Sequence, residues 1–187
     1  MARPAERIKT VHDEFLEVPD TQVAQIIDGQ LHAMPRPRPR HALASSSLGD
    51  ELVSPFQKGR GGPGGWLILD EPEIHLDSGD ILVPDLAGWR RERMPALPDT
   101  PYFETLPDWV CEILSPSTAR LDRFSKMPIY AAQGVPHLWL IDPEAHTLEV
   151  YVLHDRHWLL AQTYTDAAEV CAPPFEAISF SLAVLWG

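Results

Sequence analysis

Apolar runs of strand length, bounded by turn residues, recur through most of the chain and predict a β-rich core. They cover residues 66–71, 81–89, 108–114, 136–142, 147–153 and 157–162. The first two runs predict an antiparallel hairpin, and Pro84 indicates an edge, a bulge or a strand end in its second arm. The run 108–114 is apolar enough to be buried on both faces of a sheet, so it predicts a central strand.

Helical spacing of apolar residues is found in two segments. Leucines near the helical period predict a helix over 41–53, although a glycine in its middle is unfavourable. A second helix is predicted over 120–133, ended by Gly134. Pro128 implies either a kink in it or a start near Phe124, because proline lacks an amide donor and its ring clashes with the preceding turn.

The N-terminal part carries shorter patterns. Residues 1–17 are expected to form a flexible arm, and the Asp-Thr pair before residue 22 is expected to cap a short helix over 22–27. The Asp-Gly pair that follows predicts a tight turn before a strand at 30–34, so the N-terminal element is either ββ or αβ. Proline and arginine alternate over 35–40, which favours an extended polyproline form. This segment is either a solvated connector or a place where arginines reach a phosphate backbone.

Composition bounds the fold and the partners. The chain has 187 residues, of which 44% are hydrophobic. This predicts a single domain, residues 1–187, with a sizeable core. The formal net charge of −12 argues against a protein that coats nucleic acid through a broad basic surface. It leaves room for a small basic patch beside an acidic metal site, because a metal ion offsets local negative charge.

Cys111 and Cys171 lie in different apolar neighbourhoods, without CxxC or zinc-ligand spacing. Two buried free thiols in a reducing cytosol are therefore expected. No apolar run approaches the ~20 residues of a membrane span, and the N-terminus lacks the apolar core of a signal peptide. A cytoplasmic protein without a membrane partner is the expectation.

Three charged residues carry the candidate chemistry. Asp85 follows Pro84, and Glu112 lies 27 positions later inside the apolar run 108–114. A carboxylate buried there is costly unless it is paired or binds a metal. Lys126 follows 14 positions after the second acid. Two carboxylates and an ammonium group that converge can hold a divalent cation and support attack on a phosphate ester.

The ordered motifs around these residues resemble those of a known family. They are Pro84-Asp85-Leu-Ala-Gly-Trp, Pro107-Asp-Trp-Val-Cys-Glu-Ile-Leu-Ser-Pro-Ser-Thr, Asp122 with Lys126 and Tyr130, Gly134-Val, and Leu138-Trp-Leu-Ile-Asp-Pro. From about residue 18 to the C-terminus the chain resembles the Uma-two family of restriction-endonuclease-like proteins, placed in the PD-(D/E)XK nuclease superfamily. The resemblance implies an α/β (α+β) fold with a restriction-endonuclease-like mixed central β-sheet flanked by helices.

The resemblance also implies a metal-dependent nuclease site. In the superfamily pattern a Pro-Asp pair is followed by an acid-x-Lys motif, whereas here a leucine stands where that lysine would be. Lys126, in the next predicted helix, matches the lysine of the family. Asp85 and Glu112 match its metal ligands, and Glu71 matches a further acidic position that Glu73 could also supply.

Each of these residues has a purely structural interpretation as well. Asp85 could cap a turn. Glu112 could form a buried ion pair with Lys126 or an arginine. Lys126 could instead form a helix-surface pair with Asp122, an accessory candidate. His41 could face the site, but it also fits a helix cap or a surface position.

Arginines and tryptophans are the candidates for contacts with nucleic acid. Arg40, Arg120 and Arg123 are placed to contact phosphates, with a solvated surface as the alternative. Trp89 and Trp109 could stack on bases, although core packing is the stronger interpretation.

Together these features predict a Mg²⁺- or Mn²⁺-dependent DNA endonuclease in which Lys126 positions the attacking water. The acidic charge and the absent acid-x-Lys lysine motivate an alternative: a catalytically inactive nuclease-fold protein that serves as a nucleic-acid-binding or assembly module. A small-molecule hydrolase is a weaker third option, since no GxSxG motif is present. Sheet edges over 147–162 suggest a homodimer.

Overall fold

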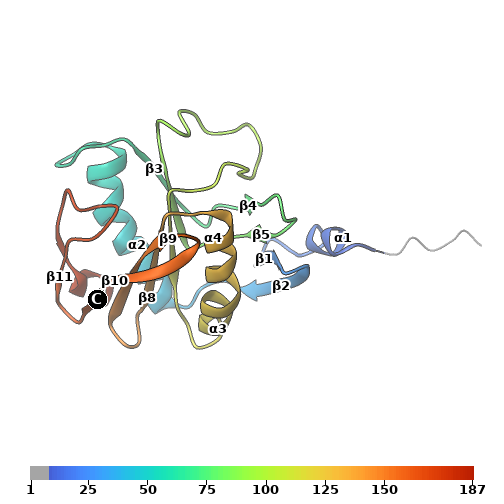
Figure 1. The fold of residues 1–187 in the computed structure, drawn as a ribbon. Helices are drawn as coiled ribbons and strands as arrows, with labels where there is room; N and C mark the ends of the chain where they lie inside the picture. Colours follow the sequence, from blue (N-terminus) through green and yellow to red (C-terminus); the bar gives the residue numbers. More distant parts are fainter. Residues whose placement is uncertain (1–8) are drawn as a thin grey trace, which may run out of the picture.

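The computed structural model describes residues 9–187 and has a mixed central β-sheet flanked by helices, which confirms the predicted α+β architecture (Figure 1). The central sheet has six strands in the order β10-β9-β8-β7-β6-β3. Their bounds are β3 (Trp66–Asp70), β6 (Leu86–Arg90), β7 (Trp109–Ile113), β8 (His137–Asp142), β9 (Thr147–His154) and β10 (His157–Thr165). β7 and β8 pair in parallel, and the other neighbours in this sheet pair antiparallel.

β7 lies inside the central sheet and is buried on both faces, as its apolar sequence predicts. Alternate residues, 109, 111 and 113, belong to a hydrophobic cluster that includes residues of α2 (Pro39–Leu52). Val110 belongs to a second cluster, with residues of the segment that follows β7. Because side chains alternate along a strand, Glu112 shares the face of Val110. The predicted helix over 41–53 corresponds to α2, which continues into the π-helical turn η1 (Val53–Gln57).

A helical crossover joins the parallel strands β7 and β8. It consists of α3 (Ala119–Leu121), the π-helical turn η2 (Asp122–Lys126) and α4 (Met127–Gln133). The extent predicted for this helix is confirmed, and Gly134 ends it in the left-handed conformation with a φ of 90°. Pro128 lies in the first turn of α4, where a missing amide donor disturbs the helix least. The wide turn η2 comes directly before it.

A second, smaller sheet has four strands in the order β2-β1-β5-β4. Their bounds are β1 (Gln22–Ile27), β2 (Gln30–Pro35), β4 (Ile74–His75) and β5 (Ile81–Leu82). The predicted hairpin is divided between the two sheets, since β3 and β6 pair in the central sheet while β4 and β5 pair in the small one. The chain passes from one sheet to the other over residues 83–85, so Pro84 marks a strand end.

In the N-terminal region the ββ alternative is correct, whereas the helix over 22–27 and the extended Pro/Arg segment are wrong. Residues 22–27 form β1 and not a helix, because their β-branched side chains suit a strand and they pair with β2 across the turn at Asp28 and Gly29. The Pro/Arg segment is not extended throughout: α2 begins at Pro39, a residue whose fixed φ suits the first turn of a helix.

Part of the expected N-terminal arm has regular structure. Residues 11–15 form the helix α1 (Val11–Phe15). It begins with a capping box in which the side chains of Thr10 and Asp13 each accept a hydrogen bond from the other's backbone amide. Residues 1–8 of the expected arm lie outside the described residues.

The two tryptophans considered for base stacking belong to the core. Trp89 and Trp109 are both 0% exposed, so the core-packing interpretation is confirmed. Trp109 packs edge-on against Trp139 and Phe175, with ring centroids 5.5 and 5.0 Å away. The short elements β11 (Glu169–Val170), β12 (Phe180–Ser181) and η3 (Leu182–Leu185) close this side of the core.

The two cysteines differ in burial. Cys111 is buried, as expected, whereas Cys171 is exposed and corrects the expectation of two buried thiols. Both are free. Within residues 9–187 there is no helix long and apolar enough to cross a membrane.

Candidate active site

A cavity of about 300 Å³ opens where the two sheets, α2 and the helical crossover meet. Six ionisable side chains that the sequence singled out line it together: His41, Glu71, Asp85, Glu112, Asp122 and Lys126. They come from α2, from the loop after β3, from the passage between the sheets, from β7 and from η2. We call this space the main cavity.

Asp85 is fixed by the passage between the two sheets. One carboxylate oxygen, Oδ2, accepts a hydrogen bond from the Ile113 amide at 2.6 Å. The other, Oδ1, lies 3.0 Å from Nε2 of His41. Because the strand pairing ends before Pro84, Asp85 takes no part in the backbone hydrogen bonds of the small sheet, and its side chain can point toward β7. His41 therefore faces the site and is neither a cap nor a surface residue, since its side chain is only 13% exposed.

Glu112 and Lys126 form a buried ion pair. Nζ of Lys126 lies 2.7 Å from Oε1 of Glu112, and both side chains are 2% exposed. The Tyr130 hydroxyl donates to the same Oε1 at 2.7 Å. Lys126 also donates to the Val83 carbonyl at 3.3 Å and lies 3.7 Å from Oδ1 of Asp122. Lys126 and Asp122 do not form the surface pair considered above, because both are buried.

The pKa values of the cluster follow from its burial and from the excess of carboxylates over lysine. Burial raises the pKa of Glu112 to about 8, although Lys126 acts to lower it. Burial likewise raises the pKa of Asp122. Burial would lower the pKa of Lys126, but the charges of Glu112, Asp122 and Asp85 outweigh it and raise that pKa. All three shifts favour the protonated forms of these groups. The carboxylates of Asp85, Glu112 and Asp122 also repel one another, and an additional cation would reduce that repulsion.

Glu71 faces the main cavity from a strained backbone position. It has a φ of 46°, in the left-handed region, and its amide donates to the Asp85 carbonyl at 3.0 Å. Its side chain pairs with Arg36 at 2.7 Å. Glu73 instead pairs with His75 at 2.7 Å and does not line the main cavity.

The family model described as "Putative restriction endonuclease", Uma2 (Uma-two), matches residues 12–184. The chain belongs to this family. The fold agrees: the crystal structure of "a putative nuclease belonging to DUF820" from Anabaena variabilis ATCC 29413 superposes with a TM-score of 0.74. It covers 95% of this chain and 98% of that chain at 23% sequence identity. No curated protein matches the sequence.

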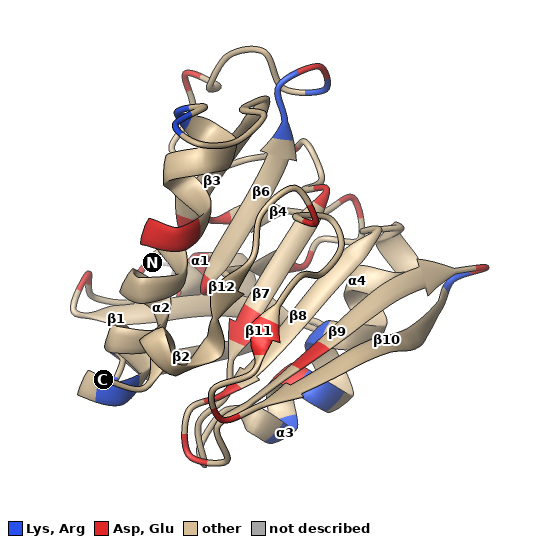
Figure 2. Ribbon diagram, turned by 90° about the vertical axis from the view of Figure 1, so that its left-hand side faces the viewer, with Lys and Arg blue, Asp and Glu red and all other residues tan. Residues whose placement is uncertain are grey.

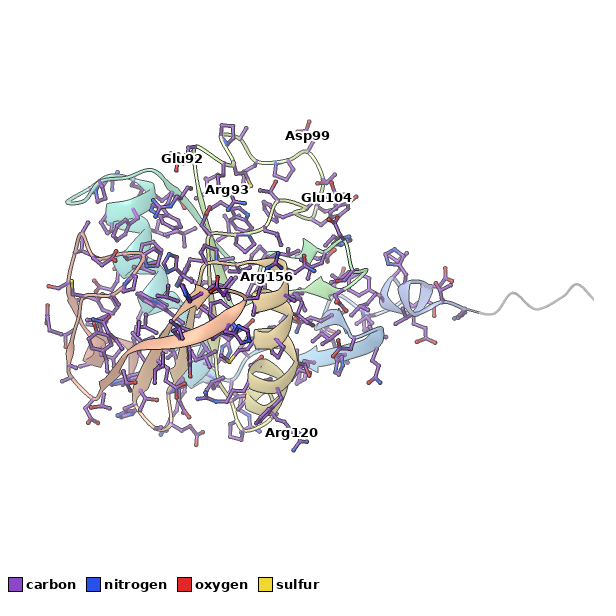
Figure 3. The ribbon with its side chains drawn as sticks, in the orientation of Figure 1. Glu92, Arg93, Asp99, Glu104, Arg120 and Arg156 are labelled. Atoms are coloured by element: carbon purple, nitrogen blue, oxygen red, sulfur yellow. The ribbon has the colours of Figure 1, made fainter. Side chains whose placement is uncertain are left out.

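The three predicted arginines lie outside the main cavity of this Uma2 chain. Arg123 forms a two-pronged ion pair with Glu149 at 2.8 and 2.9 Å. Arg120 is exposed on α3 and points away from the body of the molecule (Figure 3). Arg40 is exposed in the first turn of α2 and is not among the residues that line the cavity.

Three further residues of the site belong to segments that the sequence marked, without being chosen individually as site residues: Arg36, Arg38 and Tyr130. Arg36 and Arg38 line the main cavity although Arg40 does not. The sequence pattern is the same around all three arginines. They differ in the structure because helix α2 begins at Pro39, between Arg38 and Arg40. Tyr130 appeared in the family motif without a role; its spacing of four residues from Lys126 on one helix face is the signal that could have assigned it to the site.

Restriction-endonuclease-like nucleases such as the Uma2 proteins generally use divalent metals. Among residues 9–187, no group of three or more His, Cys, Asp or Glu side chains forms a ready-made metal site. The donor chemistry nevertheless fits a hard cation, because Asp85 and Glu112 offer carboxylate oxygens in a cavity that favours positive charge. Both contacts of Glu112 fall on Oε1, and Oε2 takes part in neither.

Proposed function

We propose that this protein is a divalent-metal-dependent DNA endonuclease that hydrolyses phosphodiester bonds in the main cavity. The observation that carries the proposal is the convergence of Asp85, Glu112 and Lys126 from three separate elements on one cavity. Membership of the Uma2 family supports the reaction class.

Asp85 and Glu112 are the proposed ligands of Mg²⁺ or Mn²⁺, with Glu71 as a further acid at the rim. The bound ion would lower the pKa of water and neutralise charge on the scissile phosphate. Asp85 is held by the Ile113 amide, and Glu112 by the Tyr130 hydroxyl, so both carboxylates are oriented before substrate arrives. His41 orients Asp85 from the opposite side.

Lys126 is the proposed catalytic cation. Its Nζ would orient the attacking water and stabilise negative charge that develops on the phosphate oxygens. Its burial strengthens this effect, since charges interact more strongly where water is excluded. Asp122 lies 3.7 Å from the same Nζ and helps to keep it protonated.

Replacement of Glu112 by Gln tests the site. We expect Glu112→Gln to abolish Mn²⁺-dependent cleavage of DNA while the protein stays folded, because the amide keeps an acceptor for Tyr130. Glu149→Gln is the matched control, since Glu149 pairs with Arg123 outside the cavity. Undiminished cleavage by the Glu112 variant would refute the assignment.

A catalytically inactive binding or assembly module is the second candidate. The net charge of −12 and the position of the lysine on the crossover favour it. Calorimetric titration with Mn²⁺ separates the two proposals. Binding that is lost in Asp85→Asn supports the nuclease, and no binding in the unmodified protein supports the inactive module.

We also propose that the protein forms a homodimer. β10 is an edge of the central sheet and exposes Leu159 and Leu160 by 53% and 55%. Such edges are usually covered. Light scattering would test this, and a monomer at all concentrations would contradict it.

A further inference from the structure

The proposed reacting groups are reachable only from within the main cavity. The side chains of Glu112 and Lys126 are each 2% exposed, and Asp85 is 18% exposed. A group that acts in hydrogen-bond catalysis must come within about 2.6–3.2 Å of its target. A scissile phosphate therefore has to enter the cavity and cannot react while it lies on the outer surface.

A strap of four residues, 35–38, forms one wall of this cavity. It joins β2 to α2. Arg36 holds it in place, because its guanidinium donates to Glu71 at 2.7 Å and to the Asp20 carbonyl at 3.1 Å. A space of about 300 Å³ bounded in this way suits one polynucleotide strand better than a base-paired helix.

A second cavity of about 310 Å³ is also lined by Arg36 and Glu71. The two cavities share Val23, Arg36, Glu71 and Val83, so they are adjacent along the same wall. The ring of Phe15, from α1, lines the second cavity. Aromatic rings are the usual stacking platforms for unpaired bases.

The charge distribution also disfavours duplex DNA. The chain has a net charge of −12, and Lys and Arg lie in short, separated segments of the ribbon (Figure 2). Duplex binding draws on many phosphate contacts over a broad basic surface. Here the cations beside the cavity are those of the strap and Lys126. No acidic side chain among residues 9–187 pairs with Arg38, which leaves its charge available to a phosphate.

We propose that the site takes single-stranded DNA, such as a frayed end or a flap, with a phosphate in the main cavity beside Arg38 and a neighbouring base on Phe15. Intact duplex is then a poor substrate, because its strands must first be separated. This inference rests on the proposed nuclease function and adds the class of its substrate.

The first experiment compares cleavage of one labelled oligonucleotide as a single strand, as a blunt duplex and as a forked duplex, all with Mn²⁺. We expect the single strand and the fork to be cleaved at least about tenfold faster, because unpairing and unstacking a base carries an energetic cost. Equal rates on all three would overturn the inference alone. If no DNA is cleaved, the proposed function fails.

Measurements of DNA binding test the preference for single strands even if no DNA is cleaved. Fluorescence anisotropy with the Glu112→Gln variant should give tighter binding of the single strand than of the duplex. Equal affinities, or a preference for the duplex, would overturn the inference whether or not any DNA is cleaved.

Paired variants test the proposed path of the strand. Arg38→Ala should weaken single-strand binding and reduce the salt dependence by about 0.7 in the slope of log K against log salt, as expected for one lost phosphate contact. Arg40→Ala, which removes another exposed arginine that does not line the cavity, should leave the slope unchanged. Equal effects of both variants would refute a specific role for Arg38.

The aromatic contact has its own control. Phe15→Ala should lower single-strand affinity about tenfold. Phe124→Ala, which removes a ring that is 74% exposed and lies outside both cavities, should have no effect. An unchanged affinity of the Phe15 variant would remove the second cavity from the path.

Discussion

The helical crossover carries two cation–carboxylate pairs whose surroundings differ sharply. Lys126 pairs with Glu112 at 2.7 Å, where both side chains are 2% exposed. Arg123, three residues earlier, pairs with Glu149 at 2.8 Å, where the side chains are 32% and 23% exposed. The first pair lies among further carboxylates, and the second is capped by the Tyr151 hydroxyl at 2.6 Å.

The two ion pairs therefore contribute differently to the stability of the fold. A buried pair is a poor source of stability, because desolvation offsets much of the attraction. A half-exposed Arg–carboxylate pair contributes modestly to stability. The difference agrees with the proposed catalytic role of Lys126 and Glu112, since stability alone does not account for burying this pair. Arg123 and Glu149 join the crossover to β9.

Loss of the buried cation should have the largest effect. We expect Lys126→Met to lower cleavage by about 10²–10⁴-fold and to destabilise the fold by about 3–5 kcal/mol, because it leaves buried carboxylates uncompensated. Urea denaturation and cleavage assays measure the two effects. A fully stable variant would show that Glu112 is already protonated in the folded protein.

Removal of both charges should separate stability from activity. Relative to Lys126→Met, the double variant Glu112→Gln with Lys126→Met should recover at least about 1 kcal/mol of stability, since no carboxylate at 112 remains unpaired. Cleavage should stay absent. Recovery of cleavage together with stability would contradict a catalytic role for the pair.

The hydroxyl of Tyr130 should have an intermediate effect. Tyr130→Phe removes one buried hydrogen bond to Glu112, with an expected cost of about 1–2 kcal/mol. Cleavage should fall about tenfold and the apparent Mn²⁺ affinity should drop as well, as for other groups that orient a metal ligand. A change in stability without a change in Mn²⁺ affinity would mark Tyr130 as structural only.

The exposed pair should matter least. Arg123→Gln should cost less than about 1 kcal/mol of stability and leave cleavage unchanged. A large loss of cleavage would show that the crossover transmits this contact to the active site.

The pH dependence of the exposed pair has a defined sign. The hydrogen bond from Arg123 lowers the pKa of Glu149 below its ordinary value of 4.5. The stability that this shift contributes is therefore present above that value and is lost as the pH falls through the lowered pKa. The small difference in thermal stability between Glu149→Gln and the unmodified protein should shrink toward zero in acid. A difference that grows in acid would contradict the assignment.

Much of this arrangement could be predicted where the sequence is locally distinctive. β7 can be recognised in the sequence as an apolar run that contains one acidic residue. Pro84 marks the strand end after which Asp85 leaves the hydrogen-bonded ladder. The helical crossover and its Gly134 terminus are equally local features. Lys126 is different: its position after Glu112 made it a candidate, but only the resemblance to the family gave it the role of the missing lysine.

Other features depend on contacts that no local pattern encodes. Residues 22–27 are ambiguous alone and become a strand because β2 and β5 pair with them. Arg36 reaches Glu71 across 35 positions, and the strap exists only because the two sheets meet there. Arg38 and Arg40 look alike in the sequence, yet only Arg38 borders the main cavity.

The turn η2 has a consequence for how such chains are found. Asp122 and Lys126 are the first and last residues of this turn, and both lie on the side of the crossover that lines the main cavity. The lysine thus reaches Glu112 from a neighbouring element and not from the strand that bears the acid. A text search for an acid followed by lysine two places later passes over this chain. A three-point template of carboxylate, carboxylate and ammonium in space would retrieve it.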